Sequence, residues 1–182
     1  MRKFKSWLAV LGLLVAFFVV APSQAQAAPY CGITWGSLAK SAGKLSSAPI
    51  TSVRAGRHAC FDRLVVDING HGGGHMVRYV ATVHREGSGT AVLLRGGAFL
   101  QVTVKDPAYI VATGAQAYRP ANPNELVNTA GYSALRQVAL AGSFESQTTL
   151  GVGVRARLPF TVFVLNGPGN QTRLVIDVAH RW

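Results

Sequence analysis

Acidic side chains are scarce in this chain, in which seven Asp and Glu stand against eighteen Lys and Arg. Sustained helical periodicity is nearly absent as well, which argues against a helical bundle. The basic residues form no long run, and no basic cluster is interleaved with aromatic residues, so we expect no nucleic-acid partner. The excess of positive charge favours either a basic surface that only confers solubility or an attraction to a polyanion.

Long hydrophobic runs are absent after residue 21, so we expect no membrane span in the body of the protein. The first residues have the pattern of an export signal: basic residues 2, 3 and 5, an apolar run over 8–21, and small residues at 25–27. That run is shorter than the roughly 20 residues of a spanning helix. We therefore expect a signal peptide over 1–27, cleavage after Ala27, and a secreted protein of one domain at the cell envelope.

Cysteine is limited to Cys31 and Cys60. In an exported protein such a pair predicts a disulfide, which closes a loop of about 30 residues and stabilises the fold by roughly 3–4 kcal/mol. A pair of reactive thiols is the disfavoured alternative. Residues 31–57 are rich in Gly, Ser, Ala and Pro and resemble a tether, with one helical turn around 38–40. We expect an N-terminal extension over 28–57 and a β-domain over 58–182.

One strand pattern occurs twice, at residues 63–68 and 173–178. Each copy has aliphatic residues at every second position, which is typical of a strand with one buried face, and an Arg and an Asp four residues apart on the other face. If the copies are antiparallel neighbours, Arg63 faces Asp177 and Asp67 faces Arg173. Each such cross-strand pair contributes roughly 0.2–1 kcal/mol.

Period-two patterns and short apolar runs predict about eight strands in all, four before and four after a long loop at 107–134. Such a loop is uncommon in a compact domain and is usually functional or mobile. The pattern predicts an all-β fold, either a sandwich or a partly open barrel. The predicted strands are 61–68, 77–84, 91–94, 100–105, 138–144, 150–154, 160–165 and 173–178.

The repeated Arg-Leu-Val-hydrophobic-Asp-hydrophobic phrase resembles the strand signature of the amidase N-terminal (AMIN) domain, and the chain from residue 28 resembles the exported AMIN-like proteins of actinobacteria. The resemblance implies a two-sheet β-sandwich and a non-catalytic module that holds wall enzymes or secretion pores at the envelope through peptidoglycan. No amidase or secretin domain follows, so we expect a free-standing module. The matching stretches are 31–38, 54–64, 94–98, 141–149, 153–160 and 177–182.

Arginine and tryptophan are the candidate binding residues. Arg155 and Arg157 alternate with Gly153 and should share one side of a strand, where guanidinium groups match carboxylates and phosphates. Trp35 and Trp182 could stack on sugar rings. Solvated arginines and buried tryptophans are the structural alternative. The predicted binding set is Trp35, Arg95, Arg136, Arg155, Arg157 and Trp182.

Catalytic and metal-binding patterns are weak. His71 and His75 flank three glycines, with His84 further on, and a flexible loop is a poor frame for zinc. Ser143 lacks the second glycine of a nucleophile elbow. Asp177 and His180 should point to opposite faces of a strand, and no pattern pairs Glu86 with Glu145.

Composition and resemblance together predict a secreted, monomeric, non-catalytic envelope module without metal or cofactor. Its expected partner is peptidoglycan or another anionic wall polymer. The first alternative is a protein–protein interaction module that localises or assists a wall enzyme. The second is a hydrolase with an unrecognised site.

Overall fold

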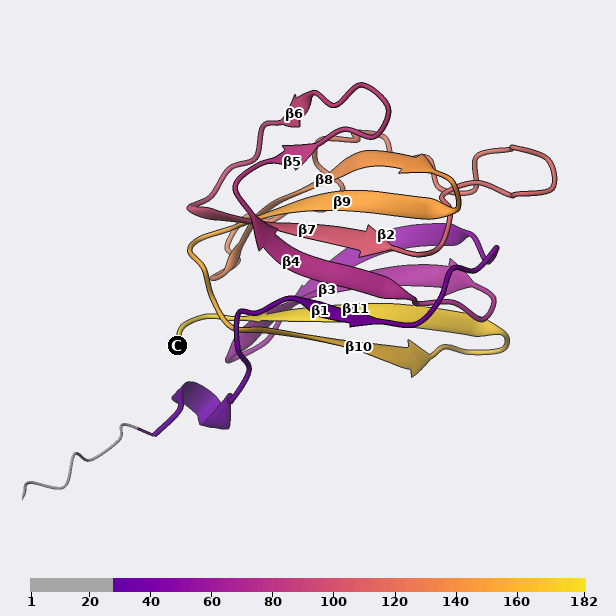
Figure 1. Cartoon of the computed structure of the whole chain (residues 1–182). Helices are drawn as coiled ribbons and strands as arrows, with labels where there is room; N and C mark the ends of the chain where they lie inside the picture. Colours follow the sequence, from indigo (N-terminus) through magenta and orange to yellow (C-terminus); the bar gives the residue numbers. More distant parts are fainter. Residues whose placement is uncertain (1–27) are drawn as a thin grey trace, which may run out of the picture.

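The protein folds as two antiparallel β-sheets packed face to face, and the computed structural model describes residues 28–182 (Figure 1). Sheet A has the strand order β1 (Lys40–Ala42), β4 (His75–Val80), β7 (Ala98–Val104), β9 (Gln147–Val154) and β8 (Leu135–Phe144). Sheet B has the order β10 (Phe160–Asn166), β11 (Gln171–Ala179), β3 (Phe61–Asn69) and β2 (Ile50–Arg57). A small hairpin joins β5 (Val83–His84) and β6 (Ala91–Val92), and a 3-10 turn spans Tyr30–Gly32.

The aliphatic alternation in the sequence forms the core between the two sheets. Every second residue of the central strands points inward and is at most 1% exposed. Within residues 28–182 there is no α-helix, and none of the helical segments could cross a membrane. The predicted all-β, two-sheet sandwich is therefore confirmed. The principal core residues are Leu64, Val66, Ile68, Leu100, Val102, Val104, Leu150, Val152, Val154, Leu174, Ile176 and Val178.

The two copies of the repeated strand, β3 and β11, are antiparallel neighbours at the centre of sheet B. Val65 lies opposite Val175, and the charged residues pair on either side of these valines. Arg63 Nε lies 2.7 Å from Asp177 Oδ1, and Arg173 Nε lies 3.8 Å from Asp67 Oδ1. The predicted cross-strand pairing is thus confirmed.

The predicted tether over 31–57 is wrong in part, because it contains two strands. The expected helical turn at 38–40 is absent, and β1 begins at Lys40. β2 pairs with β3 along its length, and a bulge between Ile50 and Ser52 shifts the register. The bulge places the buried residues Ile50 and Val53 three positions apart, so the period of two is lost from the sequence.

The predicted strand over 77–84 divides into β4 and β5, and the strand predicted over 91–94 is only the two residues of β6. The β5–β6 hairpin lies on the outer face of sheet A, where Val83 and Val92 pack against Ala139 and Ala141 of β8. The chain after β6 also crosses β9 closely: a Cβ atom on Gly153 would lie 1.9 Å from the Arg95 carbonyl oxygen. Seven strands therefore precede the long loop, where four were predicted.

The predicted long loop is confirmed as a segment without strands, with one isolated bridge between Tyr109 and Gln116. Its later part covers the outer edge of β8. Leu126 N donates to Val138 O over 2.8 Å, and Leu140 N donates to Pro123 O over 2.7 Å.

The predicted disulfide is confirmed, since Cys31 and Cys60 are bonded. It ties the 3-10 turn to the residue just before β3, and so holds the N-terminal segment against one end of the sandwich. The predicted signal peptide, residues 1–27, lies outside the described residues.

Candidate functional site

Three segments that are distant in sequence meet at one end of the sandwich. They are residues 35–37 before β1, residues 155–157 after β9, and residues 180–182 after β11. They lie together because β9 ends, β10 begins and β11 ends on this side (Figure 1). Phe160 N donates to Gly36 O over 3.1 Å, which joins the first segment to the start of β10. We call the surface formed by Trp35, Arg155, Arg157, Arg181 and Trp182 the basic end surface.

Arg157 is held in place at the centre of this surface. Its Nε donates to Ser37 Oγ over 3.1 Å, and its Nη2 donates to the Ser37 carbonyl over 3.2 Å. The guanidinium also lies 4.9 Å from the centre of the Tyr79 ring, a cation–π contact. Burial is the main cause that raises the pKa of Tyr79, so this phenol is neutral beneath the cation. Arg157 is therefore oriented by its neighbours while its side chain remains exposed.

Arg155 and Trp182 complete the exposed part of the surface. Arg155 Nη2 donates to the His180 carbonyl, and Trp182 Nε1 donates to the Arg157 carbonyl over 3.0 Å. Trp182 remains 66% exposed, so a ring face is available to a ligand. Among the described residues, neither Arg155 nor Arg157 forms an ion pair with a carboxylate.

Trp35 contributes more to the support of the surface than to its exposed part. Its ring packs edge-to-face on Phe61, with 5.6 Å between ring centres, and it is half-buried. Trp35 therefore fits the structural alternative, in which a tryptophan packs within the fold and does not bind a ligand.

Arg95 and Arg136 form a second group with a bracing role. Arg95 pairs with Glu125 and donates from Nη2 to the Arg136 carbonyl over 3.0 Å. The Arg95 hydrogen bonds lower the pKa of Glu125. Arg136 Nη1 donates to the carbonyls of Tyr132 and Leu135, each over 2.9 Å. The six predicted binding residues thus divide into an end-surface group and this pair.

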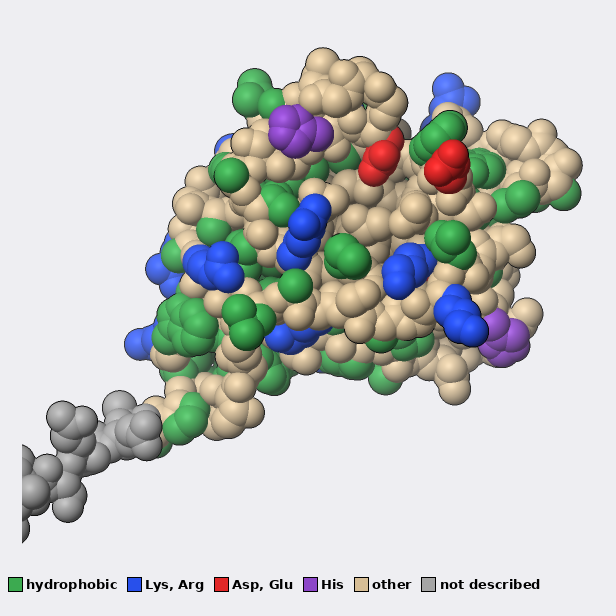
Figure 2. Space-filling view, in the orientation of Figure 1, with side chains coloured by type: hydrophobic (Ala, Val, Ile, Leu, Met, Phe, Trp, Pro, Cys, Tyr) green, Lys and Arg blue, Asp and Glu red, His purple; other side chains and the backbone are tan. Residues whose placement is uncertain are grey.

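Most of the few carboxylates are used inside the fold. Asp62, Asp106 and Asp177 are buried; Asp67 and Glu125 form ion pairs; Glu86 accepts from Thr149. Four arginines take part in ion pairs with carboxylates, so eleven of the fifteen basic residues in 28–182 have no acidic partner. Figure 2 shows Lys and Arg side chains spread over one face, while the visible acidic side chains lie near its upper edge. The exterior is strongly cationic.

The weak catalytic and metal patterns do not converge. His71 and His75 line one pocket near the β3–β4 loop, whereas His84 lies on β5, and residues 28–182 contain no group of three potential metal ligands. Ser143 Oγ accepts from Ala108 N and lies 2.9 Å from Thr148 Oγ1, so it connects strands. His180 bonds to Asp62 and not to Asp177.

The residues 71–74 form a packed loop and not the flexible loop expected from their glycines. Gly73 and Gly74 are buried, and Gly73 N donates to Asp106 Oδ2 over 2.8 Å. Asp106 Oδ1 accepts from Ser46 Oγ. Asp106 was not among the predicted functional residues, although it continues the alternation of the buried residues Leu100, Val102 and Val104. A buried carboxylate at this position organises the β3–β4 loop.

Burial raises the pKa of Asp106, and the bonds from Ser46 and Gly73 offset this only in part. A carboxyl whose pKa is higher in the folded than in the unfolded state favours folding fully at pH values below its unfolded pKa. That contribution is lost as the pH rises through the folded value. We therefore expect the stability of the protein, relative to Asp106→Asn, to fall as the pH rises from the unfolded pKa of an aspartate, about 4, through the higher folded pKa.

Urea unfolding of both proteins across this pH range measures the difference between their free energies of unfolding. The contributions of the other titrating groups are the same in both proteins and cancel in this difference. A difference that stays constant, or that grows in favour of Asp106 as the pH rises, would contradict the assigned direction.

The family comparison agrees with this architecture. The family model for the AMIN-like domain matches residues 48–180, which include every strand from β2 to β11. No curated protein sequence and no solved structure matches the chain. A cell-wall-associated module at an extracytoplasmic location fits this match. With most of its length and nearly all of its sandwich covered by the match, this protein belongs to the AMIN-like domain family.

Proposed function

We propose that this protein is a secreted, non-catalytic module that binds an anionic cell-wall polymer, such as peptidoglycan, through the basic end surface. The observation that supports this most strongly is the position of Arg155 and Arg157. Both are exposed, oriented by neighbouring groups and without a carboxylate partner in residues 28–182, and they stand beside the exposed ring of Trp182. Cleavage after Ala27 would leave residues 28–182 as the mature module.

The chemistry of these side chains suits a wall polymer. A guanidinium forms paired hydrogen bonds with carboxylates of stem peptides or with phosphates of anionic glycans. An exposed indole face offers apolar area for a sugar ring. Because Ser37 and Tyr79 already orient Arg157, little side-chain entropy remains to be lost on binding.

A shallow pocket next to Arg157 provides room for part of such a ligand. It has a volume of about 370 Å³ and is lined by Tyr79, Phe99 and Arg157 among others. Gly97 forms part of its wall, and a Cβ there would lie 2.5 Å from the Arg155 carbonyl oxygen. We propose that an aromatic-walled pocket beside a fixed cation receives one sugar or one peptide side group.

The double variant Arg155→Ser/Arg157→Ser tests this assignment. We expect its retention on purified, protein-free sacculi to fall at least tenfold, because two charge-assisted contacts are lost. The measurement is a sedimentation assay with varied sacculus concentration at fixed ionic strength. Arg78→Ser/Arg119→Ser is the matched control, since both arginines are exposed, lack carboxylate partners and carry the same charge.

Equal losses in the two double variants would mean that net charge, and not the basic end surface, determines binding. Unchanged retention of Arg155→Ser/Arg157→Ser would place the site elsewhere. Retention only in the presence of cell extract would indicate a protein partner, and release of soluble wall fragments would indicate a hydrolase.

A further inference from the structure

The strand β10 has a free edge. It pairs only with β11, at the border of sheet B (Figure 1). Hydrogen bonds from Ala179 N to Pro159 O and from Gly167 N to Gln171 O show that the odd-numbered residues of β10 are the ones bonded to β11. In an antiparallel pair, alternate residues turn their peptide groups to opposite edges, so the even-numbered residues of β10 face away from β11.

The peptide groups at this edge are largely unused. Phe160 N donates to Gly36 O, but the N–H and C=O groups of Val162, Val164 and Asn166 have no hydrogen-bond partner within residues 28–182. They form a row of donors and acceptors of the kind that pairs with another strand.

Nothing in the sequence of β10 protects this edge. Residues 160–166 contain no proline and no charge, and the ladder with β11 has no bulge. Val164 and Leu165 are each 42% exposed. By contrast, the outer edge of β2 carries a bulge and two arginines, and residues 123–126 cover the outer edge of β8. An unprotected apolar edge is typical of a surface that pairs with another chain.

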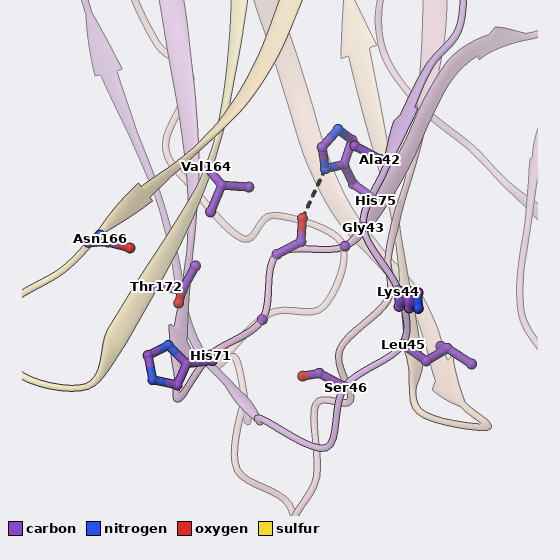
Figure 3. A pocket seen from close by; sticks show the side chains of 13 residues that line it. Ala42, Gly43, Lys44, Leu45, Ser46, His71, His75, Val164, Asn166 and Thr172 are labelled. Carbon is purple, nitrogen blue, oxygen red and sulfur yellow. Dashed lines mark hydrogen bonds between the residues drawn. The ribbon is translucent and has the colours of Figure 1, made fainter.

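A pocket of about 420 Å³ opens beside the second half of this edge, at the opposite end from Arg155 and Arg157. Figure 3 shows Val164, Asn166 and Thr172 on one side of it and the segment from Ala42 to Ser46 on the other, with the glycine loop between them. His75 Nδ1 lies 2.9 Å from the Gly73 carbonyl oxygen, which fixes the ring at the back of the pocket. The pocket can receive a side chain from a strand paired with β10.

The charge around the pocket is of one sign. The described chain contains three lysines, and two of them lie at the pocket: Lys44 lines it, and Lys105 Nζ donates to the carbonyl of Gly43, which also lines it. The third, Lys40, lies over Phe160 at the start of β10. None of the lining residues is acidic. The nearby Asp106 is buried beneath the glycine loop. This arrangement complements a negatively charged segment.

We propose that the free edge of β10 accepts an extended, acidic segment of a partner polypeptide as a fifth strand of sheet B. Its main chain pairs with Val162, Val164 and Asn166. One of its side chains enters the pocket, and a neighbouring carboxylate meets Lys44. A second copy of this protein is a poorer occupant, because the mature chain carries a net charge of +8.

The test uses the ¹⁵N-labelled mature protein and, as probe, an eight-residue peptide of alternating Glu and Val, with alternating Lys and Val as the matched peptide. We expect the acidic peptide to slow amide hydrogen exchange at Val162, Val164 and Asn166 and to leave the already bonded amides of Thr161 and Phe163 unchanged. Lys44→Glu should weaken binding about fivefold and Arg119→Glu should not, because Lys44 lines the pocket and Arg119 does not.

Val164→Pro gives an independent check, since it removes a free-edge N–H without removing a bond to β11. It should abolish the exchange protection at Asn166 while circular dichroism shows the fold retained. Three results would overturn the proposal. The first is slowed amide exchange that is confined to the basic end surface. The second is equal binding of the acidic and basic peptides. The third is protection of the edge amides without peptide that increases with protein concentration, which would indicate self-association.

Discussion

Asp62→Ala is expected to lower the free energy of unfolding by about 4 kcal/mol, the largest effect predicted for a single residue here. The Asp62 carboxylate is fully buried. Its Oδ2 accepts from the N–H groups of Ala134 and Leu135, at the start of β8, and its Oδ1 lies 3.0 Å from His180 Nε2. One side chain from sheet B therefore satisfies groups from sheet A and from the segment after β11. Alanine would leave the two buried N–H groups of Ala134 and Leu135 without a partner, and it would also remove the partner of the half-buried His180 ring.

Urea unfolding followed by tryptophan fluorescence and by circular dichroism measures this loss. His180→Ala is the graded comparison, because it removes one of the three contacts and leaves the two backbone bonds, so we expect a loss of about 1 kcal/mol. Asp62→Asn should lie between the two variants. A loss below 1 kcal/mol for Asp62→Ala would show that water replaces the carboxylate and that the two sheets are not joined through it.

Replacement of the disulfide by serines, Cys31→Ser/Cys60→Ser, is expected to cost about 3 kcal/mol of stability. The cysteines are 29 residues apart, and their bond restricts the unfolded chain. The folded state should change little, because β3 keeps its pairing with β2 and β11. The edge-to-face contact of Trp35 with Phe61 and the cation–π contact of Arg181 with Tyr30 also continue to hold the N-terminal segment.

Denaturation of the oxidised protein, the reduced wild type and the serine variant separates the causes. Agreement between the reduced and serine proteins would show that the covalent link is responsible and not the new hydroxyls. A cost below 1 kcal/mol would mean that residues 31–60 stay compact in the unfolded chain, so that the bond restricts little.

The central strands could be predicted because their inward positions alternate without interruption. β3, β7, β9 and β11 all follow a period of two, and the repeated Arg and Asp even indicated which strands are neighbours. The edge strand β10 was predicted from a continuous apolar run instead. β2 could not be predicted in this way, because its bulge disturbs the period. β1 has three residues, Lys-Ser-Ala, and pairs along one edge only, so it has no apolar face to reveal it.

The candidate site was predictable in composition but not in arrangement. Alternation along one strand was expected to place Arg155 and Arg157 together; in the structure both follow the end of β9, and bonds to His180 and Ser37 hold them. Those bonds join segments more than twenty residues apart, which no local pattern reveals. The burial of Asp62 could have been predicted from the sequence, since the alternation that buries Leu64 also places Asp62 on the buried face.

The charges on β3 and β11 also exclude wrong alignments of these strands. A slip by an even number of residues keeps every aliphatic side chain on the buried face, so the hydrophobic pattern alone cannot reject it. A slip of four residues would bring Arg63 opposite Arg173 in one direction, or Asp67 opposite Asp177 in the other, and like charges directly opposite one another are destabilising. The duplicated motif thus specifies the register of its own pairing: the hydrophobic residues determine which face is buried, and the charged residues determine the position along the strand.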